Sequence, residues 1–206
     1  MLRTELIPAI QQSEPRLLIA LHGLGDSMEG YRWLPEAMGL PWLSYLLVNA
    51  PEPYYGGFAW YDLYGNPSPG IQRSRQSLFD LLDEMRAGKF AAEKIVVFGF
   101  SQGCLMAVEI GARYPHRLAG IVGVSGYVHE AMRLVPELSP QARQQRFLIT
   151  HGTEDPLLPI ERTRRQVELL QRAGLKIDWR EFAKPHIIDV QAELPVLRDF
   201  VRNSYV

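Results

Sequence analysis

One five-residue motif gives the clearest sign of chemistry in this chain. Residues 99–103 read Gly-Phe-Ser-Gln-Gly and directly follow the apolar run Ile95–Phe98, with a helical pattern beginning near Cys104. A serine at such a tight strand-to-helix turn exposes its hydroxyl, and the helix N-terminus behind it favours developing negative charge. We therefore expect Ser101 to be a nucleophile that attacks a carbonyl carbon. The alternative is a serine that only caps the helix.

A serine hydroxyl needs a general base, and the base needs an acid to orient it. The turn resembles the nucleophile elbow of α/β-hydrolases, in which the acid follows the serine in the chain and the histidine comes last. After Ser101, the apolar run Phe147–Thr150 leads into a turn that holds Glu154 and Asp155. We expect Asp155 to be the acid, because its short side chain suits a fixed orienting role. Glu154 is expected in solvent, and the alternative for Asp155 is a helix cap.

The base is predicted from chain order among five histidines. Only His186 follows Asp155, so we expect it to act as general base and then as general acid. His22 and His151 each close a strand in a His-Gly pair, where a structural hydrogen bond is the usual role. The remaining two histidines are expected at the surface.

A second glycine-containing loop is expected beside the serine. Residues 21–26 read Leu-His-Gly-Leu-Gly-Asp and follow the first long apolar run. Glycines let the backbone approach a ligand closely. Attack on a carbonyl places negative charge on its oxygen, and we expect the backbone N–H groups of Leu24 and Gln102 to stabilise it. The alternative is a phosphate-binding loop. It is disfavoured because neither G-x-x-x-x-G-K-[ST] nor G-x-G-x-x-G follows.

The segment from residue 51 to residue 70 is dense in glycine, proline and aromatic residues. Long loops in compact domains are typically functional or disordered, and the aromatic residues favour function. We interpret the segment as one wall of an acyl pocket, with Trp60 lining it and Leu157 opposite. Tyr54 and Tyr55 are expected to pack the loop onto the sheet instead.

Short apolar runs alternate with helical patterns along the chain. The runs typical of parallel strands buried on both faces are Leu17–Leu21, Tyr45–Val48, Ile95–Phe98, Gly120–Val124 and Phe147–Thr150. Apolar stripes predict helices around Leu78–Met85, Cys104–Arg113, Val167–Leu170 and Leu194–Val201. Lys176–Phe182 is expected near the sheet edge, and Thr4–Ile7 as an antiparallel strand. The sequence therefore predicts an α/β fold with a doubly wound, mostly parallel sheet, as one domain over residues 1–206 without a separate cap domain.

Composition excludes several classes of protein. The chain has 206 residues, of which 47% are hydrophobic and 22% charged, as in globular domains. A net charge of -1 gives no long-range attraction to nucleic acid, and we expect no such partner. Cys104 is the only cysteine, and the first residues lack the pattern of a secretion signal. We expect a cytoplasmic protein without integral membrane association.

Four segments together resemble the phospholipase/carboxylesterase family of α/β-hydrolases, which includes the acyl-protein thioesterases. They are residues 21–27, 59–62, 99–103 and 151–159. The resemblance implies an α/β-hydrolase fold with a Ser101–His186–Asp155 triad, oxyanion amides at Leu24 and Gln102, no metal or other cofactor, and often a homodimer. Pro185 stands where the family usually has glycine. Because proline fixes its own φ and disfavours the αR region for the residue before it, the histidine loop is expected to follow a different path.

The expected function is hydrolysis of carboxylic esters with short- to medium-chain acyl groups through an acyl-enzyme. The partner would be a small-molecule ester or acyl thioester. Acyl-protein thioesterase and lysophospholipase activities are alternatives within the same chemistry. From another class, the alternative is a non-catalytic binding protein with a hydrolase fold.

Overall fold

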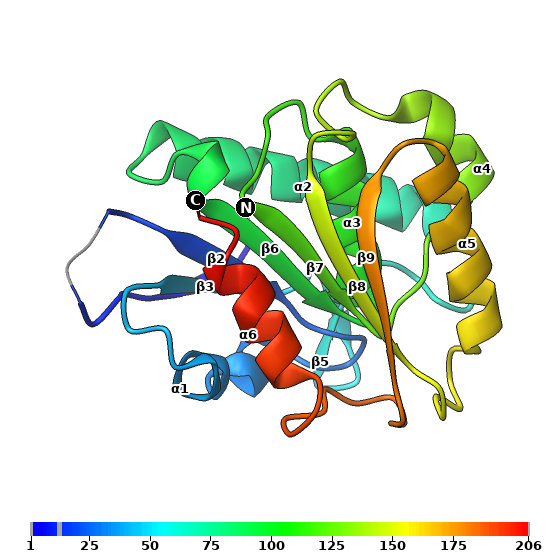
Figure 1. Ribbon diagram of the computed structural model, residues 1–206, viewed down its shortest axis with the longest axis horizontal. Helices are drawn as coiled ribbons and strands as arrows, with labels where there is room; N and C mark the ends of the chain where they lie inside the picture. Colours follow the sequence, from blue (N-terminus) through cyan, green and yellow to red (C-terminus); the bar gives the residue numbers. More distant parts are fainter. Residues whose placement is uncertain (1, 12–13, 206) are drawn as a thin grey trace.

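The computed structural model describes residues 2–11 and 14–205, so the predicted domain boundaries at residues 1 and 206 lie outside it. In the described part of the chain, seven strands form one sheet in the order β1-β3-β2-β6-β7-β8-β9 (Figure 1). The strands are β1 (Thr4–Ile7), β2 (Leu17–Leu21), β3 (Ser44–Val48), β6 (Ile95–Phe100), β7 (Gly120–Val124), β8 (Arg146–Gly152) and β9 (Lys176–Phe182). All pairs are parallel except β1 with β3. The strand predicted near an edge, β9, lies at one edge of the sheet, and β1 is antiparallel as predicted and forms the other edge.

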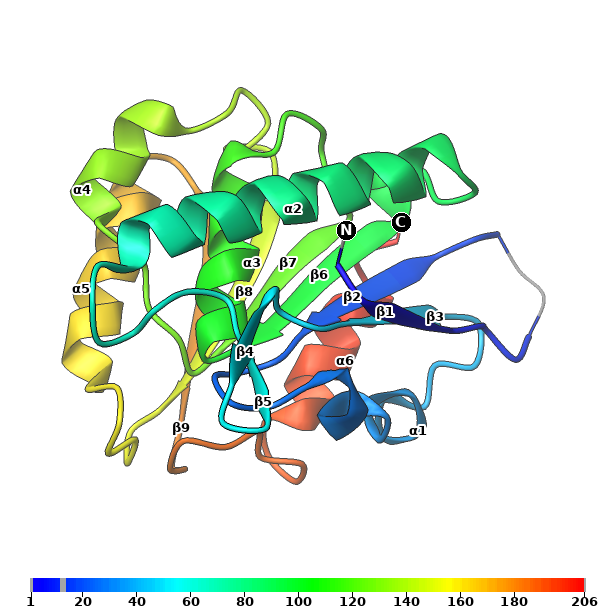
Figure 2. The same ribbon diagram turned by 180° about the vertical axis from the view of Figure 1, so that it is seen from behind.

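Helices cover both faces of the sheet. On one face lie α1 (Leu34–Met38) and α6 (Leu194–Arg202), seen in front in Figure 1. On the other lie α2 (Pro67–Ala87), α3 (Gln102–Arg113) and α5 (Ile160–Arg172), with α2 in front in Figure 2. The short helices are α4 (Ala131–Leu134), η1 (Met28–Tyr31), η2 (Ala92–Lys94) and η3 (Val135–Glu137).

The buried central strands show why the sheet needs two helical layers. All five residues of β2 are buried, and successive side chains of a strand point to opposite faces. Leu17, Ile19 and Leu21 accordingly belong to the core beneath α2 and α3. Leu18 and Ala20 belong to the core beneath α1 and α6. The predicted doubly wound α/β class is confirmed.

The segment from residue 51 to residue 70 is more regular than the loop that its composition predicts. It contains a two-stranded antiparallel hairpin, β4 (Glu52–Tyr54) with β5 (Gly57–Ala59), and the first turn of α2. Helix α2 begins early because the Asn66 side chain accepts a hydrogen bond from the Ser68 N–H, and proline is favoured at the first helical position.

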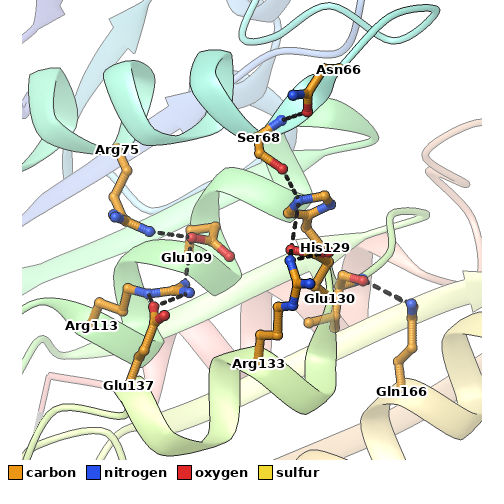
Figure 3. Close-up of polar contacts among 11 residues, drawn as sticks. Asn66, Ser68, Arg75, Glu109, Arg113, His129, Glu130, Arg133, Glu137 and Gln166 are labelled. Atoms are coloured by element: carbon orange, nitrogen blue, oxygen red, sulfur yellow. Dashed lines mark hydrogen bonds and ion pairs between the residues drawn. The ribbon is translucent and has the colours of Figure 1, made fainter.

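A charge network around the buried Glu109 holds α2 against α3 (Figure 3). The Glu109 side chain on α3 is 2% exposed, and its Oε2 lies 2.9 Å from Arg75 Nη1 of α2 and 2.5 Å from Arg113 Nη1. Arg113 Nη2 also lies 2.7 Å from Glu137 Oε2. Because a buried carboxylate is costly unless paired, this network favours a single arrangement of the two helices.

Within residues 2–11 and 14–205, no helix is long and apolar enough to cross a membrane. In the same ranges, no group of three or more His, Cys, Asp or Glu side chains is placed to hold a metal ion.

Candidate active site

Ser101 lies between the last residue of β6 and the first residue of α3, at the carboxyl end of the sheet. Its backbone has φ 54° and ψ −114°, a region that L-residues seldom occupy. The strand and helix pass too closely for side chains at the flanking glycines. A Cβ atom on Gly99 would collide with the Gly103 backbone, and one on Gly103 would collide with the Leu21 backbone. Tight packing therefore imposes the strained turn that exposes the serine hydroxyl.

The structure brings together the three side chains that the sequence predicts as a triad. His186 Nε2 lies 3.0 Å from Ser101 Oγ, and His186 Nδ1 lies 2.6 Å from Asp155 Oδ2. The other carboxylate oxygen, Asp155 Oδ1, accepts hydrogen bonds of 2.9 Å from the backbone N–H groups of Leu157 and Leu158. The three side chains come from loops after β6, β8 and β9.

The carboxylate sets the direction of these hydrogen bonds. Burial alone would raise the pKa of Asp155, but the hydrogen bonds from His186 and from the Leu158 and Leu157 amides outweigh it and hold the pKa below its ordinary value. An ionised carboxylate only accepts hydrogen bonds, so His186 Nδ1 donates to it. His186 Nε2 is then the acceptor for the Ser101 hydroxyl. This arrangement can move a proton from the serine to the imidazole.

The loops that carry the acid and the base are bound to each other. Thr153 N–H donates to Phe182 O at 2.8 Å, and Glu154 N–H donates to Lys184 O at 3.2 Å. Gly152 allows this approach, because a Cβ atom there would collide with the Lys184 carbonyl. The Glu154 side chain is exposed, in agreement with its predicted place in solvent.

The loop that follows β2 is held beside Ser101 by its neighbours. The buried His22 ring donates from Nδ1 to Gly23 O at 2.6 Å and accepts from Ala50 N–H at Nε2 at 3.0 Å. Burial lowers the pKa of His22, which favours this neutral form. Gly25 N–H also donates to Phe58 O of β5 at 2.9 Å. The structural role predicted for His22 agrees with these contacts.

The two residues predicted to supply the oxyanion amides lie near Ser101 in the structure. Leu24 and Gln102 both line the cavity at Ser101. Gln102 is the first residue of α3, and the first N–H groups of a helix have no partner within it. In the described part of the chain, we find no hydrogen bond from either amide to another protein group. Both N–H groups are therefore free to bind a ligand oxygen.

A cavity of about 360 Å³ opens onto Ser101 and His186. Its volume falls within the range of small-molecule sites. Leu157, predicted to bind substrate, lines it. Its wall is mainly apolar and includes Tyr61, Leu63, Tyr64, Phe100, Tyr127, Leu157 and Leu158. The cavity can accept an apolar chain attached to a carbonyl group at Ser101.

The prediction that Trp60 lines this cavity is wrong. The Trp60 side chain is fully buried, and its indole N–H donates to His22 O at 2.9 Å. A buried indole N–H needs an acceptor. The hydrogen bond to the His22 carbonyl places the Trp60 ring beneath the loop after β2. The next residue, Tyr61, lines the cavity instead, and its hydroxyl lies 3.1 Å from the Tyr127 hydroxyl.

The two tyrosines predicted to pack onto the sheet lie at the β4–β5 hairpin. Tyr55 is at the turn with φ 43° and is 95% exposed, so the prediction is wrong for this residue. The half-buried Tyr54 ring contacts Tyr55 edge-on, with ring centroids 4.8 Å apart.

Several cavity residues were not predicted from the sequence. Tyr127 comes soon after β7, at the same edge of the sheet as the other site loops. Its position after a parallel strand could have predicted it as a cavity residue. Leu63 and Tyr64 lie in the aromatic segment already interpreted as a pocket wall. The Gln102 side chain also binds this segment, accepting from Trp60 N–H at 2.9 Å and donating to Tyr61 O at 3.0 Å.

Comparison with protein families and curated proteins gives a consistent result. The model of the phospholipase/carboxylesterase family matches residues 3–204. Acyl-protein thioesterase 1 of Schizosaccharomyces pombe is 35% identical over 155 residues, which cover 69% of each chain. The protein of the same name from Debaryomyces hansenii is 28% identical over 202 residues, covering 84% of this chain and 86% of its own.

Solved structures share the fold. The crystal structure of esterase PE8 superposes with a TM-score of 0.87 at 24% identity and covers 98% of both chains. A Bacillus cereus carboxylesterase superposes with a TM-score of 0.83 at 20% identity, covering 99% of this chain and 95% of its own. At these identities the likeness establishes the α/β-hydrolase fold alone.

Proposed function

This chain belongs to the phospholipase/carboxylesterase family of serine hydrolases, and we propose that it cleaves carboxylic esters of short- to medium-chain acyl groups with Ser101, His186 and Asp155 as its triad. One observation carries the proposal. A single imidazole lies within hydrogen-bond distance of both a strained serine hydroxyl, at 3.0 Å, and a carboxylate, at 2.6 Å.

The geometry supports a two-step acyl transfer. Ser101 Oγ attacks the carbonyl carbon while His186 Nε2 takes the hydroxyl proton, and Asp155 stabilises the imidazolium that forms. The N–H groups of Leu24 and Gln102 bind the oxyanion. Collapse of the tetrahedral intermediate breaks the bond to the alcohol or thiol, which leaves with the proton from His186. Water, deprotonated by His186, then attacks the acyl-enzyme and releases the carboxylic acid and Ser101.

The shape of the site supports an accessible acyl group. The cavity is small, mainly apolar and open to solvent, and Leu157 on its rim is 67% exposed. Short and medium acyl chains would fill such a cavity, whereas a longer chain would extend beyond it into water. Acyl-protein thioesters and lysophospholipids remain alternatives with the same chemistry, and the names of the relatives favour the acyl-protein thioesters.

Labelling with a fluorophosphonate probe tests the nucleophile. The parent protein is expected to be labelled, and Ser101→Ala is expected to lose labelling and at least about a thousandfold of kcat. Ser77→Ala, on the half-exposed side of α2, is the matched control and should behave as the parent does. Labelling that persists in Ser101→Ala would refute the assignment. A parent protein that is never labelled would favour the non-catalytic alternative.

A graded substrate series tests the specificity. We expect kcat/KM for p-nitrophenyl acyl esters to be highest between the butyrate and the octanoate and to fall toward the palmitate. A palmitoyl thioester, assayed beside them, distinguishes the thioesterase alternative. Higher kcat/KM for the palmitoyl thioester than for every short ester would refute the proposed substrate class.

A further inference from the structure

Lys184 is a buried cation two residues before His186. It is 1% exposed, and its ammonium group has three acceptors. Nζ lies 2.6 Å from Glu193 Oε2, 2.7 Å from Ile187 O and 3.1 Å from Ser125 Oγ. An ammonium carries three donors, so each of them has a partner. Burial lowers the pKa of Lys184, and the adjacent Glu193 carboxylate opposes that shift.

These contacts enclose the turn that carries His186. Before the histidine, the Lys184 backbone is bound on both sides, with its N–H 2.9 Å from Phe182 O and its carbonyl accepting from Glu154 N–H. After the histidine, the Ile187 carbonyl accepts from the Lys184 ammonium. Lys184 thus precedes the histidine, and its side chain binds the residue that follows it, so this one residue spans the turn. Pro185 has no N–H to donate, but its carbonyl accepts from Ile187 N–H at 2.9 Å, and the lysine side chain adds a second contact across the same turn.

The same ammonium group connects the histidine loop to the frame of the nucleophile. Ser125 follows β7 with a positive φ of 49°, and its N–H donates to Thr150 O at 2.9 Å. The residue before it, Val124, accepts a 2.9 Å hydrogen bond from Ser101 N–H. Lys184 thus contacts a turn that is bonded directly to the backbone of the serine.

Glu193 fixes the other end of the loop. Its side chain is fully buried just before α6, and Oε2 also accepts from Asp189 N–H at 3.1 Å. Replacing a buried ion pair by well-packed hydrophobic residues of similar volume is often neutral or stabilising. A gain in folding stability therefore does not explain the Lys184–Glu193 ion pair. The pair is explained if it fixes the position of the histidine loop.

We propose that Lys184 and Glu193 are positioning residues that hold the His186 imidazole between Ser101 and Asp155. The inference rests on the proposed function. A displacement of about 1 Å in a reacting group costs about a hundredfold in rate. The loss of the Lys184 and Glu193 contacts around this turn should therefore reduce kcat far more than it changes substrate binding.

The double variant Lys184→Met with Glu193→Gln tests the inference, because it removes both charges and leaves no buried ion unpaired. We expect a folded protein with kcat lower by about tenfold or more and KM within about twofold of the parent. Lys94→Met is the matched control: it removes a lysine ion-paired at 2.9 Å with Glu14 on the surface, and kcat should not change. A folded double variant with kcat within about twofold of the parent would overturn the proposal.

A second measurement does not depend on turnover. In the parent, the His186 Nδ1 proton shared with Asp155 should give a far-downfield proton NMR resonance in water. The double variant should shift or broaden this resonance, and an unchanged resonance counts against the inference. If the parent shows no Ser101-dependent activity, the proposed function fails, while the resonance still reports the position of the imidazole.

A milder variant covers the case in which the double variant does not fold. Ser125→Ala removes one acceptor and keeps the Lys184–Glu193 pair. We expect kcat to fall severalfold with KM unchanged, since the link from the histidine loop to the serine turn is lost. Unchanged kcat and an unchanged Nδ1 resonance in this variant would overturn the proposal.

Discussion

Replacement of Asp155 by asparagine tests the hydrogen-bond chain in the site. Asp155 Oδ1 accepts from the Leu157 and Leu158 amides at 2.9 Å each, and only an oxygen can do so. In Asp155→Asn, the carbonyl oxygen must keep that position, which directs the new NH₂ group at His186 Nδ1. The amide donates there, so the ring proton moves to Nε2, the atom that faces Ser101. The loop stays in place, but the imidazole can no longer accept the serine proton.

The expected loss follows from the missing base. A triad acid changed to its amide costs about 10⁴ in kcat, which corresponds to about 5.4 kcal/mol at 1.36 kcal/mol per tenfold. Steady-state hydrolysis of p-nitrophenyl butyrate measures it, and KM should stay within about twofold because no cavity wall changes. Glu154→Gln makes the same chemical change at the adjacent exposed carboxylate and should leave kcat unchanged. A folded Asp155→Asn protein within about tenfold of the parent would refute the reasoning.

Three further predictions concern specificity and stability. Leu157→Ala should lower kcat/KM for the octanoate ester by about fivefold, through lost apolar contact, and leave the acetate ester unchanged; an equal loss for both would contradict this. The lowered pKa of Asp155 stabilises the fold above the unfolded carboxyl's pKa of about 3.9, and this contribution is lost as pH falls through the lower folded pKa. Urea unfolding of the parent and Asp155→Asn should therefore converge at acid pH, and a constant difference would argue against it. Glu109→Ala should lower the unfolding free energy by about 3 kcal/mol, because Arg75 and Arg113 lose a shared buried partner, and kcat should not change. Urea titration measures the difference, and an unchanged free energy would count against that pairing.

Much of the fold could be predicted because its signals are local. Strands buried on both faces, such as β2 and β7, must be apolar throughout, and that pattern is visible in the chain itself. Gly99 and Gly103 mark the turn at Ser101, since side chains there would collide with backbone. Local composition also misled: the glycines, prolines and tyrosines of residues 51–70 predicted a loop, yet they form a hairpin and the first turn of α2.

The order of serine, acid and histidine along the chain was enough to select Ser101, Asp155 and His186. In a parallel sheet, loops that follow successive strands meet at one edge, so order along the chain becomes proximity in space. The sequence by itself thus determined the fold class and the three side chains that meet at 3.0 and 2.6 Å.

Only the tertiary structure decided that Tyr61 rather than Trp60 lines the cavity, and which distant side chains hold the histidine loop. Trp60 turned inward because its indole N–H finds the carbonyl of His22, 38 residues away, and Tyr61 took the place at the cavity. Lys184 reaches Ser125, 59 residues away, in a contact that no local pattern indicates. The hydrogen-bond partner of such a side chain comes from a distant segment packed against it, so residue type and spacing along the chain do not identify that partner.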